Sequence, residues 1–416
     1  MFKRRAFLKL CGTVALGVLA VRNHARSRLA ADPPQGARTM GKQPDENHLI
    51  TLFLCGDVMT GRGIDQVLPF PNDPRLYEPW VQSAMRYVAL AEAVNGPISR
   101  PVDFPYIWGD ALAEFERISP DVRIINLETA VTSRDDRAHK GIHYRMHPKN
   151  IAVLTAAGID CAVMANNHVL DWGQSGLTET LSTLHDAGIK TAGAGADIGS
   201  ATTPAILKVG DNSRVLVFSY GAESSGIPRY WAARADRPGV ALVKDLSAET
   251  VRQIAKRVTL IKRTGDIAVV SLHWGGNWGY EIPPEQTFFA HRLIDEAGVD
   301  VVHGHSSHHV KAIEVYRDRP ILYGCGDFIS DYEGIEGNEP YRDDLGLMYF
   351  VTMDPASGKL VRLAMTPTRL KRFRINQASN SETQWLEGLL NREGRQFGTG
   401  VTRDGNNELT LHWGNA

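Results

Sequence analysis

Short apolar runs alternate with segments of helical periodicity over most of this chain, and the alternation restricts its fold more than any other feature. The predicted strands are residues 50–54, 122–126, 161–164, 215–219, 267–272, 299–303 and 321–324. The predicted helices between them are residues 151–157, 177–187, 248–264 and 284–297. Gly158, Gly188 and Gly298 follow three of these helices, as C-terminal caps do. The pattern predicts an α/β protein whose sheets are covered by helices.

The length of 416 residues is sufficient for one large α/β domain. We expect a signal peptide at 1–31, a linker at 32–47, the main domain at 48–373 and a C-terminal extension at 374–416. Within the main domain, 69–109 is predicted to be an insertion with a helix at 80–94, and 382–391 is predicted to form a terminal helix. The formal net charge of −1 argues against nucleic acid as a partner.

The first thirty residues resemble a twin-arginine export signal. Arg4 and Arg5 precede Phe7-Leu8-Lys9, and the apolar run at 10–21 is shorter than the ~20 residues that a membrane span requires. Small residues at 29–31 would permit cleavage. We therefore expect export by the twin-arginine machinery to the periplasm or the outer face of the cytoplasmic membrane, with the signal either cleaved or kept as an anchor. A basic N-terminus beside a buried helix is the alternative.

Four cysteines are present, and Cys11 lies in the signal, where Lys9 argues against a lipoprotein. The remaining Cys55, Cys161 and Cys325 lie in apolar, strand-like stretches. We expect buried free thiols rather than a disulfide framework.

Five of the strand ends run directly into polar residues with metal-binding chemistry. They are Gly56-Asp57, Asn126-Leu127-Glu128, Asn166-Asn167-His168, His273-Trp274-Gly275 and the histidine-rich segment 303–309. Ligands bind where the strands of open α/β sheets end, so these side chains can converge on one crevice. Carboxylate, amide and imidazole groups are donors for divalent metals, which polarise phosphoryl groups and acidify bound water.

In this order the motifs resemble those of the CapA/PgsA family of poly-γ-glutamate capsule synthesis proteins, a branch of the calcineurin-like metallophosphoesterases. The resemblance covers residues 50 to 370. It implies a four-layer α/β sandwich, in which two sheets are flanked by helices. It also implies one or two divalent ions per chain, of Mn, Fe, Zn or Mg.

The resemblance implies a role for each motif residue. Asp57 would bind the first metal and Glu128 would bridge the two. Asn167, His273 and His305 would bind the second metal, and His308 would complete the first site. His168 would protonate the leaving group or hold the phosphate.

Two further residues are assigned to the same site. The fork of Arg62 suits an anion clamp for phosphate or carboxylate oxygens. Asp327 stands where the family usually has asparagine, and its carboxylate could orient a metal-binding histidine from behind.

Two departures from the superfamily pattern leave the activity open. Met59 replaces the histidine of Asp-x-His, and His308 lies one residue later than the second histidine of Gly-His-x-His. We expect a capsule or poly-γ-glutamate biosynthesis protein whose partner is a polyglutamate synthase or export complex or an anionic polymer. An exported phosphatase or phosphodiesterase acting on a small phosphoester is one alternative. A non-catalytic, polymer-binding scaffold subunit is the other.

Several neighbouring residues receive simpler interpretations. His303 is expected to be structural, and the role of His309 is open. Solvent-exposed loops are expected to contain His139, His143, His147, Arg134, Arg137, Lys140 and the segment 331–333. A substrate groove is the alternative for the three basic residues. Residues 224–231 could cover the crevice, which Trp274, Trp278 and Tyr280 are expected to line.

Overall fold

The computed structural model describes residues 49–414. The predicted export signal at 1–31, the linker at 32–47 and Cys11 therefore lie outside the described residues. Within 49–414, no helix combines the length and the apolar character that are needed to cross a membrane.

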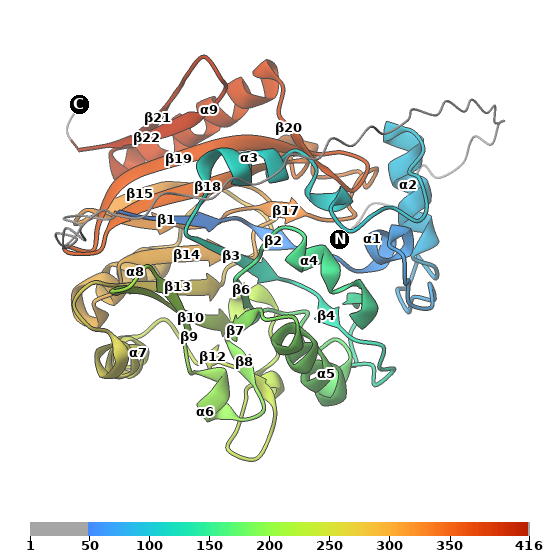
Figure 1. Cartoon of the computed structure of the whole chain (residues 1–416), viewed down its shortest axis with the longest axis horizontal. Coiled ribbons are helices and arrows are strands. Elements are labelled where there is room, and N and C mark those ends of the chain that lie inside the picture. Colours follow the sequence, from blue (N-terminus) through green and yellow to red (C-terminus); the bar gives the residue numbers. More distant parts are fainter. Residues whose placement is uncertain (1–48, 415–416) are drawn as a thin grey trace, which may run out of the picture. The chain divides into compact units, whose positions relative to one another are not determined.

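The larger sheet has eleven strands and contains the N-terminal motifs (Figure 1). Its central path is β17 (Asp327–Ile329), β2 (Asp57–Val58), β3 (Val122–Leu127), β1 (Ile50–Leu54), β18 (Leu345–Asp354), β19 (Lys359–Leu370), β22 (Leu409–Trp413) and β21 (Thr399–Arg403). Beside β3 lie β6 (Cys161–Val163) and β7 (Lys190–Ala192), and β20 (Ile375–Gln377) pairs with β19. The strands β17, β2, β3 and β6 run parallel, so their carboxyl ends share one edge.

The second sheet has seven strands and contains the C-terminal histidine motifs. Its strands are β12 (Leu242–Val243), β10 (Ser213–Ala222), β13 (Asp266–His273), β14 (Val301–His305), β16 (Arg319–Leu322), β15 (Ile313–Tyr316) and β9 (Ala205–Val209). Parallel pairing of β10, β13 and β14 buries both faces of these strands, which explains their continuous apolar sequence.

The two sheets pack against each other and are covered by helices on their outer faces, so the predicted four-layer α/β sandwich is confirmed. An inner core contains Leu52 and Tyr349 from the larger sheet together with Val217 and Val269 from the smaller one. The outer core of the larger sheet includes α1 (Arg62–Val67), α3 (Ala111–Ile118), α4 (Ala152–Thr155) and α5 (Gly173–Asp186). The outer core of the smaller sheet includes α7 (Ala248–Ile261) and α8 (Pro284–Ala297).

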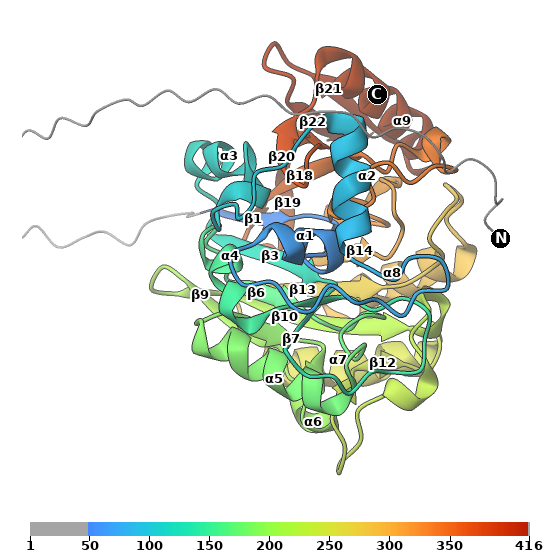
Figure 2. The ribbon, with the colours of Figure 1, turned by 90° about the vertical axis from the view of Figure 1, so that its right-hand side faces the viewer.

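Most predicted elements are present, with shifted ends. The helix 284–297 is correct, and the strand expected at 299–303 is β14 at Val301–His305. That shift places His305 inside a strand. The three capping glycines have φ values of 61°, 79° and 68°, a left-handed conformation that favours glycine. In the insertion, the helix expected at 80–94 is α2 (Met85–Asn95) (Figure 2).

The residues after 374 continue the larger sheet and its core. Strand β22 pairs with β19, and α9 (Asn380–Gly394) packs Leu386 and Leu389 into the inner core. Ser379 begins α9 with a capping box that it forms with Glu382, a Ser-x-x-Glu pattern. Figure 1 shows α9 beside β21 and β22. The described cysteines, Cys55, Cys161 and Cys325, are buried and free, as predicted.

Candidate metal centre

The motif residues meet where the parallel strands of the two sheets end. In the larger sheet Asp57 lies between Asp327 on one neighbouring strand and Asn126 on the other. In the smaller sheet His273 and His305 are register partners on β13 and β14. The topology therefore brings five distant segments of the sequence to one location.

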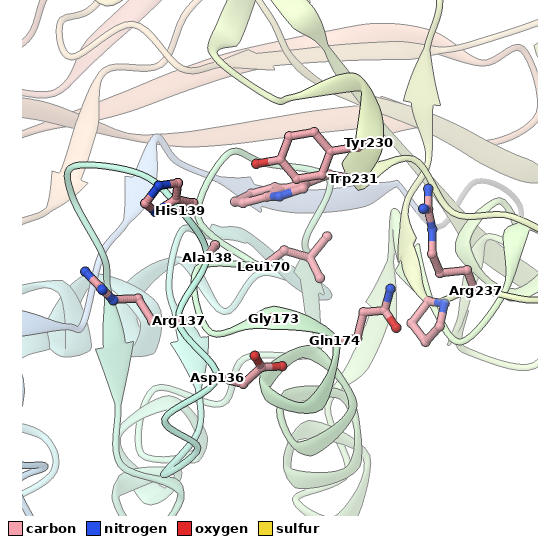
Figure 3. Close-up of a pocket in the computed structure, with 11 residues that line it drawn as sticks. Asp136, Arg137, Ala138, His139, Leu170, Gly173, Gln174, Tyr230, Trp231 and Arg237 are labelled. Atoms are coloured by element: carbon pink, nitrogen blue, oxygen red, sulfur yellow. The ribbon is translucent and has the colours of Figure 1, made fainter.

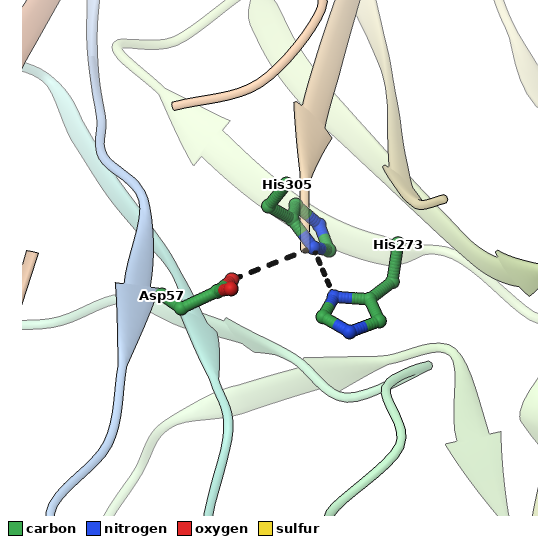
Figure 4. Close-up of side chains that lie close together, drawn as sticks. All are labelled: Asp57, His273 and His305. Carbon is green, nitrogen blue, oxygen red and sulfur yellow. Dashed lines mark hydrogen bonds and ion pairs between the residues drawn. The ribbon is translucent and has the colours of Figure 1, made fainter. Parts of the chain in front are cut away.

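Asp57, His273 and His305 form a buried cluster with the composition of a metal site (Figure 4). One ligand atom from each lies within 4.8 Å of the others, and each residue is at most 1% exposed. The Nδ1 atoms of the two histidines are 2.8 Å apart, and His305 Nδ1 is 3.8 Å from Asp57 Oδ1. Two imidazoles and a carboxylate are a donor set that first-row divalent metals accept.

A chain of hydrogen bonds orients the two imidazoles. His273 Nε2 lies 2.9 Å from Asn167 Oδ1, and His305 Nε2 lies 2.7 Å from Ser271 Oγ. A neutral imidazole has one donor and one acceptor nitrogen. If Asn167 Oδ1 accepts from His273 Nε2, then His273 Nδ1 has a lone pair directed at the N–H of His305. Burial keeps the pKa of both histidines well below the usual value, so both rings are neutral and able to act as ligands.

Glu128 completes the cluster with a carboxylate that has a buried, unsatisfied oxygen. Its Oε2 has no hydrogen-bond partner among the described residues, while Oε1 lies 3.8 Å from His273 Nε2 and 3.9 Å from His168 Nε2. Burial, together with the negative charges of Asp57 and Asp327, raises the pKa of Glu128 well above its usual value. Buried carboxylates with this surplus of negative charge fit a divalent cation, which would compensate it.

Asp57 is held in place by the backbone and by Asn126. Asn126 Nδ2 donates to Asp57 Oδ1 at 2.6 Å, and the backbone N–H of Ser306 lies 3.3 Å from Oδ2. Ser306 has a φ of 100°, a conformation that is rare for a residue with a side chain. Burial and the charge of Asp327 raise the pKa of Asp57 to about 7.

His308 and Asp327 form a pair beside this cluster. His308 Nδ1 is 3.0 Å from both oxygens of Asp327. Although burial lowers the pKa of His308, the charge of Asp327 raises it above the usual value. The contact matches the expected orientation of a histidine by Asp327, while metal binding by His308 stays a prediction.

His168 is part of a charged network that the sequence analysis did not predict. Its Nδ1 is 2.6 Å from Asp171 Oδ2, and its ring stacks on Tyr144 at 3.8 Å between centroids. Lys140 Nζ donates to Asp171 Oδ1 at 2.7 Å and to the backbone oxygen of Asn167 at 2.6 Å. Burial would raise the pKa of Asp171, but the charges of His168 and Lys140 hold it below its usual value. Burial lowers the pKa of His168 to about 4.

The predicted solvated position of Lys140 is therefore wrong, because its ammonium group joins the Asn167 backbone to Asp171. Asp171 could have been found from its spacing, three residues after His168 in the same loop. No local pattern identifies Lys140, which lies about thirty residues before its partners in the sequence.

The structure does not support Arg62 as an anion clamp. Its guanidinium donates to Glu78 at 3.0 Å and forms two bonds to Asp331, so two buried carboxylates already balance its charge. It also lies over the ring of Tyr87 at 3.7 Å. Asp331 is fully buried, so the expected surface loop at 331–333 is wrong at this residue. Arg62 and Asp331 instead fix α1 against the loop that follows β17.

Other neighbouring residues have structural roles. His303 bonds to the backbone oxygen of Cys55 at 2.7 Å, in line with its expected role. His143 is 3% exposed, so its expected exposure is wrong. Trp274 is 2% exposed and packs in the outer core of the smaller sheet instead of lining the crevice. The Sδ atom of Met59 lies 3.1 Å from the backbone N–H of Gly61, within its own turn.

A cavity of about 470 Å³ lies next to this network (Figure 3). Leu170, which precedes Asp171, and Trp231 line it, and Lys140 Nζ is 5.2 Å from the Trp231 ring. The cavity is also lined by Asp136, Arg137, His139, Tyr230 and Arg237. Part of the segment expected to cover the crevice, Tyr230 and Trp231, thus forms a wall of this cavity.

The fold and the buried cluster define a class: a four-layer α/β protein with a metal-capable Asp/His centre at the strand ends. Within that class, the chain belongs to the bacterial capsule synthesis protein family PGA_cap, whose sequence model matches residues 51–332.

The chain is similar to several characterised or named proteins. It is 50% identical to the probable polyglutamine synthesis accessory protein of Mycobacterium tuberculosis. The 374 aligned residues cover 89% of this chain and 97% of that protein. It is 27% identical to the PGA biosynthesis protein CapA of Bacillus subtilis, over 68% of this chain and 64% of that protein. It is 23% identical to the capsule biosynthesis protein CapA of Bacillus anthracis, over 69% of this chain and 61% of that protein. A solved structure described as a novel phosphatase of Mycoplasma pneumoniae covers 82% of this chain and 98% of that one, at 10% identity and a TM-score of 0.44.

Proposed function

We propose that this protein is an accessory protein of capsular poly-glutamate biosynthesis, with a divalent-metal centre that acts outside the cytoplasmic membrane. Membership of the capsule synthesis family and the printed roles of the similar proteins support the biosynthetic part. The cluster of Asp57, His273 and His305, with the unpaired oxygen of Glu128, carries the metal-centre part. The twin-arginine-like start of the sequence supports the location.

The residues around the cluster divide into metal ligands and groups that handle substrate. Asp57, Glu128, His273 and His305 would hold the ion, which supplies Lewis-acid polarisation and an acidified water when bound. His168, held by Asp171 and stacked on Tyr144, is positioned to exchange a proton with a leaving group.

The cavity beside the centre is suited to an anionic chain. Arg137, His139 and Arg237 line it together with one acidic residue, Asp136. The Nε atom of Arg237 is buried and has no hydrogen-bond partner among residues 49–414. Tyr230 is 58% exposed at the same cavity and offers a flat contact surface. We propose that a poly-glutamate segment binds here, with Lys140 between the polymer and the metal centre.

A non-catalytic, polymer-binding role is the second candidate, and Met59 favours it. This residue replaces a histidine ligand of the superfamily pattern, and its sulfur is engaged in its own turn. In that case the cavity would bind polymer and the metal would only fix the architecture of the site.

Deletion of the gene and complementation with variants would test the biosynthetic role. We expect the deletion strain to lose cell-bound poly-glutamate and the wild-type gene to restore it. His273→Asn should fail to restore cell-bound poly-glutamate at equal levels of exported protein. His185→Asn, at a residue of α5 that is not part of the cluster, should restore it. Full restoration by His273→Asn would contradict a role for the metal centre.

Purified protein would separate the two candidates. Turnover of phosphoesters that depends on added Mn²⁺ or Zn²⁺ supports the catalytic role. Saturable binding of poly-γ-glutamate without metal-dependent turnover supports the scaffold.

A further inference from the structure

A second cavity, on the outer side of the smaller sheet, has features of a ligand site that capsule synthesis does not explain. It measures about 490 Å³ and is bounded by β12, by α6 (Ile198–Ala201) and by one face of α7. The elements around it are visible in the lower part of Figures 1 and 2. Its residues Ile254, Arg257 and Leu260 recur along α7 at intervals of three residues, so the helix turns one face towards it.

The charged residues that line this cavity are all positive. Lys244, Lys256 and Arg257 line it, and no aspartate or glutamate does. Elsewhere on α7, Arg252 is paired with Glu249 at 2.7 Å. Outside the lining, Asp245 lies close enough to Lys244, and Glu249 close enough to Lys256, to interact with these lysines electrostatically. Three cations and no carboxylate in the lining favour an anionic occupant.

Tyr220 supplies an independent observation. It lies on β10, lines the cavity and is 5% exposed, yet its hydroxyl has no hydrogen-bond partner in the described part of the chain. A buried hydroxyl without a partner is unfavourable, and a ligand oxygen at this position would satisfy it. Burial raises the pKa of Tyr220 to about 12, although Arg257 partly opposes this, so the hydroxyl stays protonated and available as a donor.

The rest of the lining is apolar. Ile254 is buried at its base, and Leu260 lines it with 84% of its surface exposed. An exposed leucine alone needs no explanation, but beside three cations and the buried Tyr220 hydroxyl it provides contact for a hydrophobic body.

We propose that this cavity binds an amphiphilic anion, a molecule with a phosphate or carboxylate head that meets Arg257, Lys244 and the Tyr220 hydroxyl, and an apolar body that lies against Ile254 and Leu260. The site lies on the face of the smaller sheet that α7 covers, in a different core from the inner one between the sheets. Its occupation therefore does not require the metal centre.

Titration calorimetry of the full chain with four probes tests the proposal. The probes are decyl phosphate, decanoate, decanol and inorganic phosphate, each kept below the concentration at which it aggregates. We expect saturable binding of decyl phosphate, decanoate or both, at least about tenfold tighter than that of decanol or inorganic phosphate. The tighter of the two anionic probes identifies the head group.

Three variants locate the binding. Tyr220→Phe should lower the affinity for the tighter-binding anionic probe roughly fivefold, the effect of one lost hydrogen bond. It should not lower the melting temperature, since the hydroxyl has no hydrogen-bond partner among the described residues. Arg257→Gln should weaken it at least about tenfold. Arg252→Gln, on the same helix but outside the cavity, should leave the affinity within about twofold of the wild-type value. Absence of saturable binding to the wild-type chain, equal binding of inorganic phosphate, or unchanged affinity in both cavity variants would overturn the proposal.

Discussion

His273 and His305 face each other as register partners on adjacent parallel strands, with their Nδ1 atoms 2.8 Å apart. Two buried imidazoles at this distance share one proton between nitrogens that could both bind a metal. Their outer nitrogens are fixed by Asn167 and Ser271, so neither ring can turn away without losing a hydrogen bond. The pair is therefore organised before a metal arrives, and binding an ion would replace the shared proton.

The metal-dependent stability of the protein should increase with pH. Burial is the main reason that the pKa of Asp57 is raised to about 7. The protonated carboxyl therefore stabilises the metal-free fold, fully below about pH 4, the ordinary pKa of aspartate. This contribution is lost as the pH rises through about 7. A cation requires the charged carboxylate. Thermal melts with and without saturating Mn²⁺ should therefore show a larger stabilisation at about pH 8 than at about pH 5.5. An equal shift at both values would contradict the coupling.

Asp171 should orient the imidazole of His168 through its contact with Nδ1. Replacing Asp171 with asparagine removes the negative charge that orients His168 and pairs with Lys140. If the protein hydrolyses phosphoesters, Asp171→Asn should lower the turnover about 10- to 100-fold, against roughly 10²- to 10⁴-fold for His168→Ala. Steady-state kinetics at saturating metal measures both. Wild-type turnover in Asp171→Asn, with loss in His168→Ala, would show that His168 needs no such partner.

Arg62 should matter for stability. Arg62→Ala leaves Glu78 and Asp331 buried without their counter-charge, so we expect a loss of about 3–5 kcal/mol in the free energy of unfolding. Urea denaturation provides the measurement. Arg75→Ala is the control, because its ion pair with Asp73 is exposed and should contribute less than about 1 kcal/mol. A variant at position 62 that is as stable as the control would contradict this charge-balancing role.

Arg237 should contribute to polymer binding. Its Nε atom is buried at the cavity beside the metal centre and has no hydrogen-bond partner in the part of the chain that the structure describes, so a carboxylate there would gain a charge-assisted hydrogen bond. Arg237→Gln should weaken binding of poly-γ-glutamate about tenfold at low salt. Arg292→Gln, at a half-buried residue on α8 that is paired with Glu296, should not weaken it. Fluorescence anisotropy with labelled polymer measures the affinities. Equal weakening in both variants would indicate non-specific charge attraction.

The sequence was sufficient to predict which strands run into the motif residues, because apolar runs followed by Asp, Asn and His are local patterns. It could not show what surrounds them. The pairing of Arg62 with Asp331 spans 269 positions. The residues next to Arg62 in the sequence therefore do not indicate that a distant carboxylate balances its charge. Lys140 was likewise interpreted from its polar neighbours, while its position is set by the fold of the loop that contains Asp171. Long-range pairing of charges thus decided the roles that the sequence analysis missed.

The most direct test of the account is the metal stoichiometry of the purified full chain, measured by equilibrium dialysis against Mn²⁺ or Zn²⁺ followed by elemental analysis. The account predicts at least one tightly bound ion per wild-type chain, lost in His273→Asn and in Asp57→Asn and retained in His309→Asn, a histidine of the same motif outside the cluster. A wild-type chain that binds no divalent ion near neutral pH, or a His273→Asn variant that keeps the full amount, would contradict the metal centre.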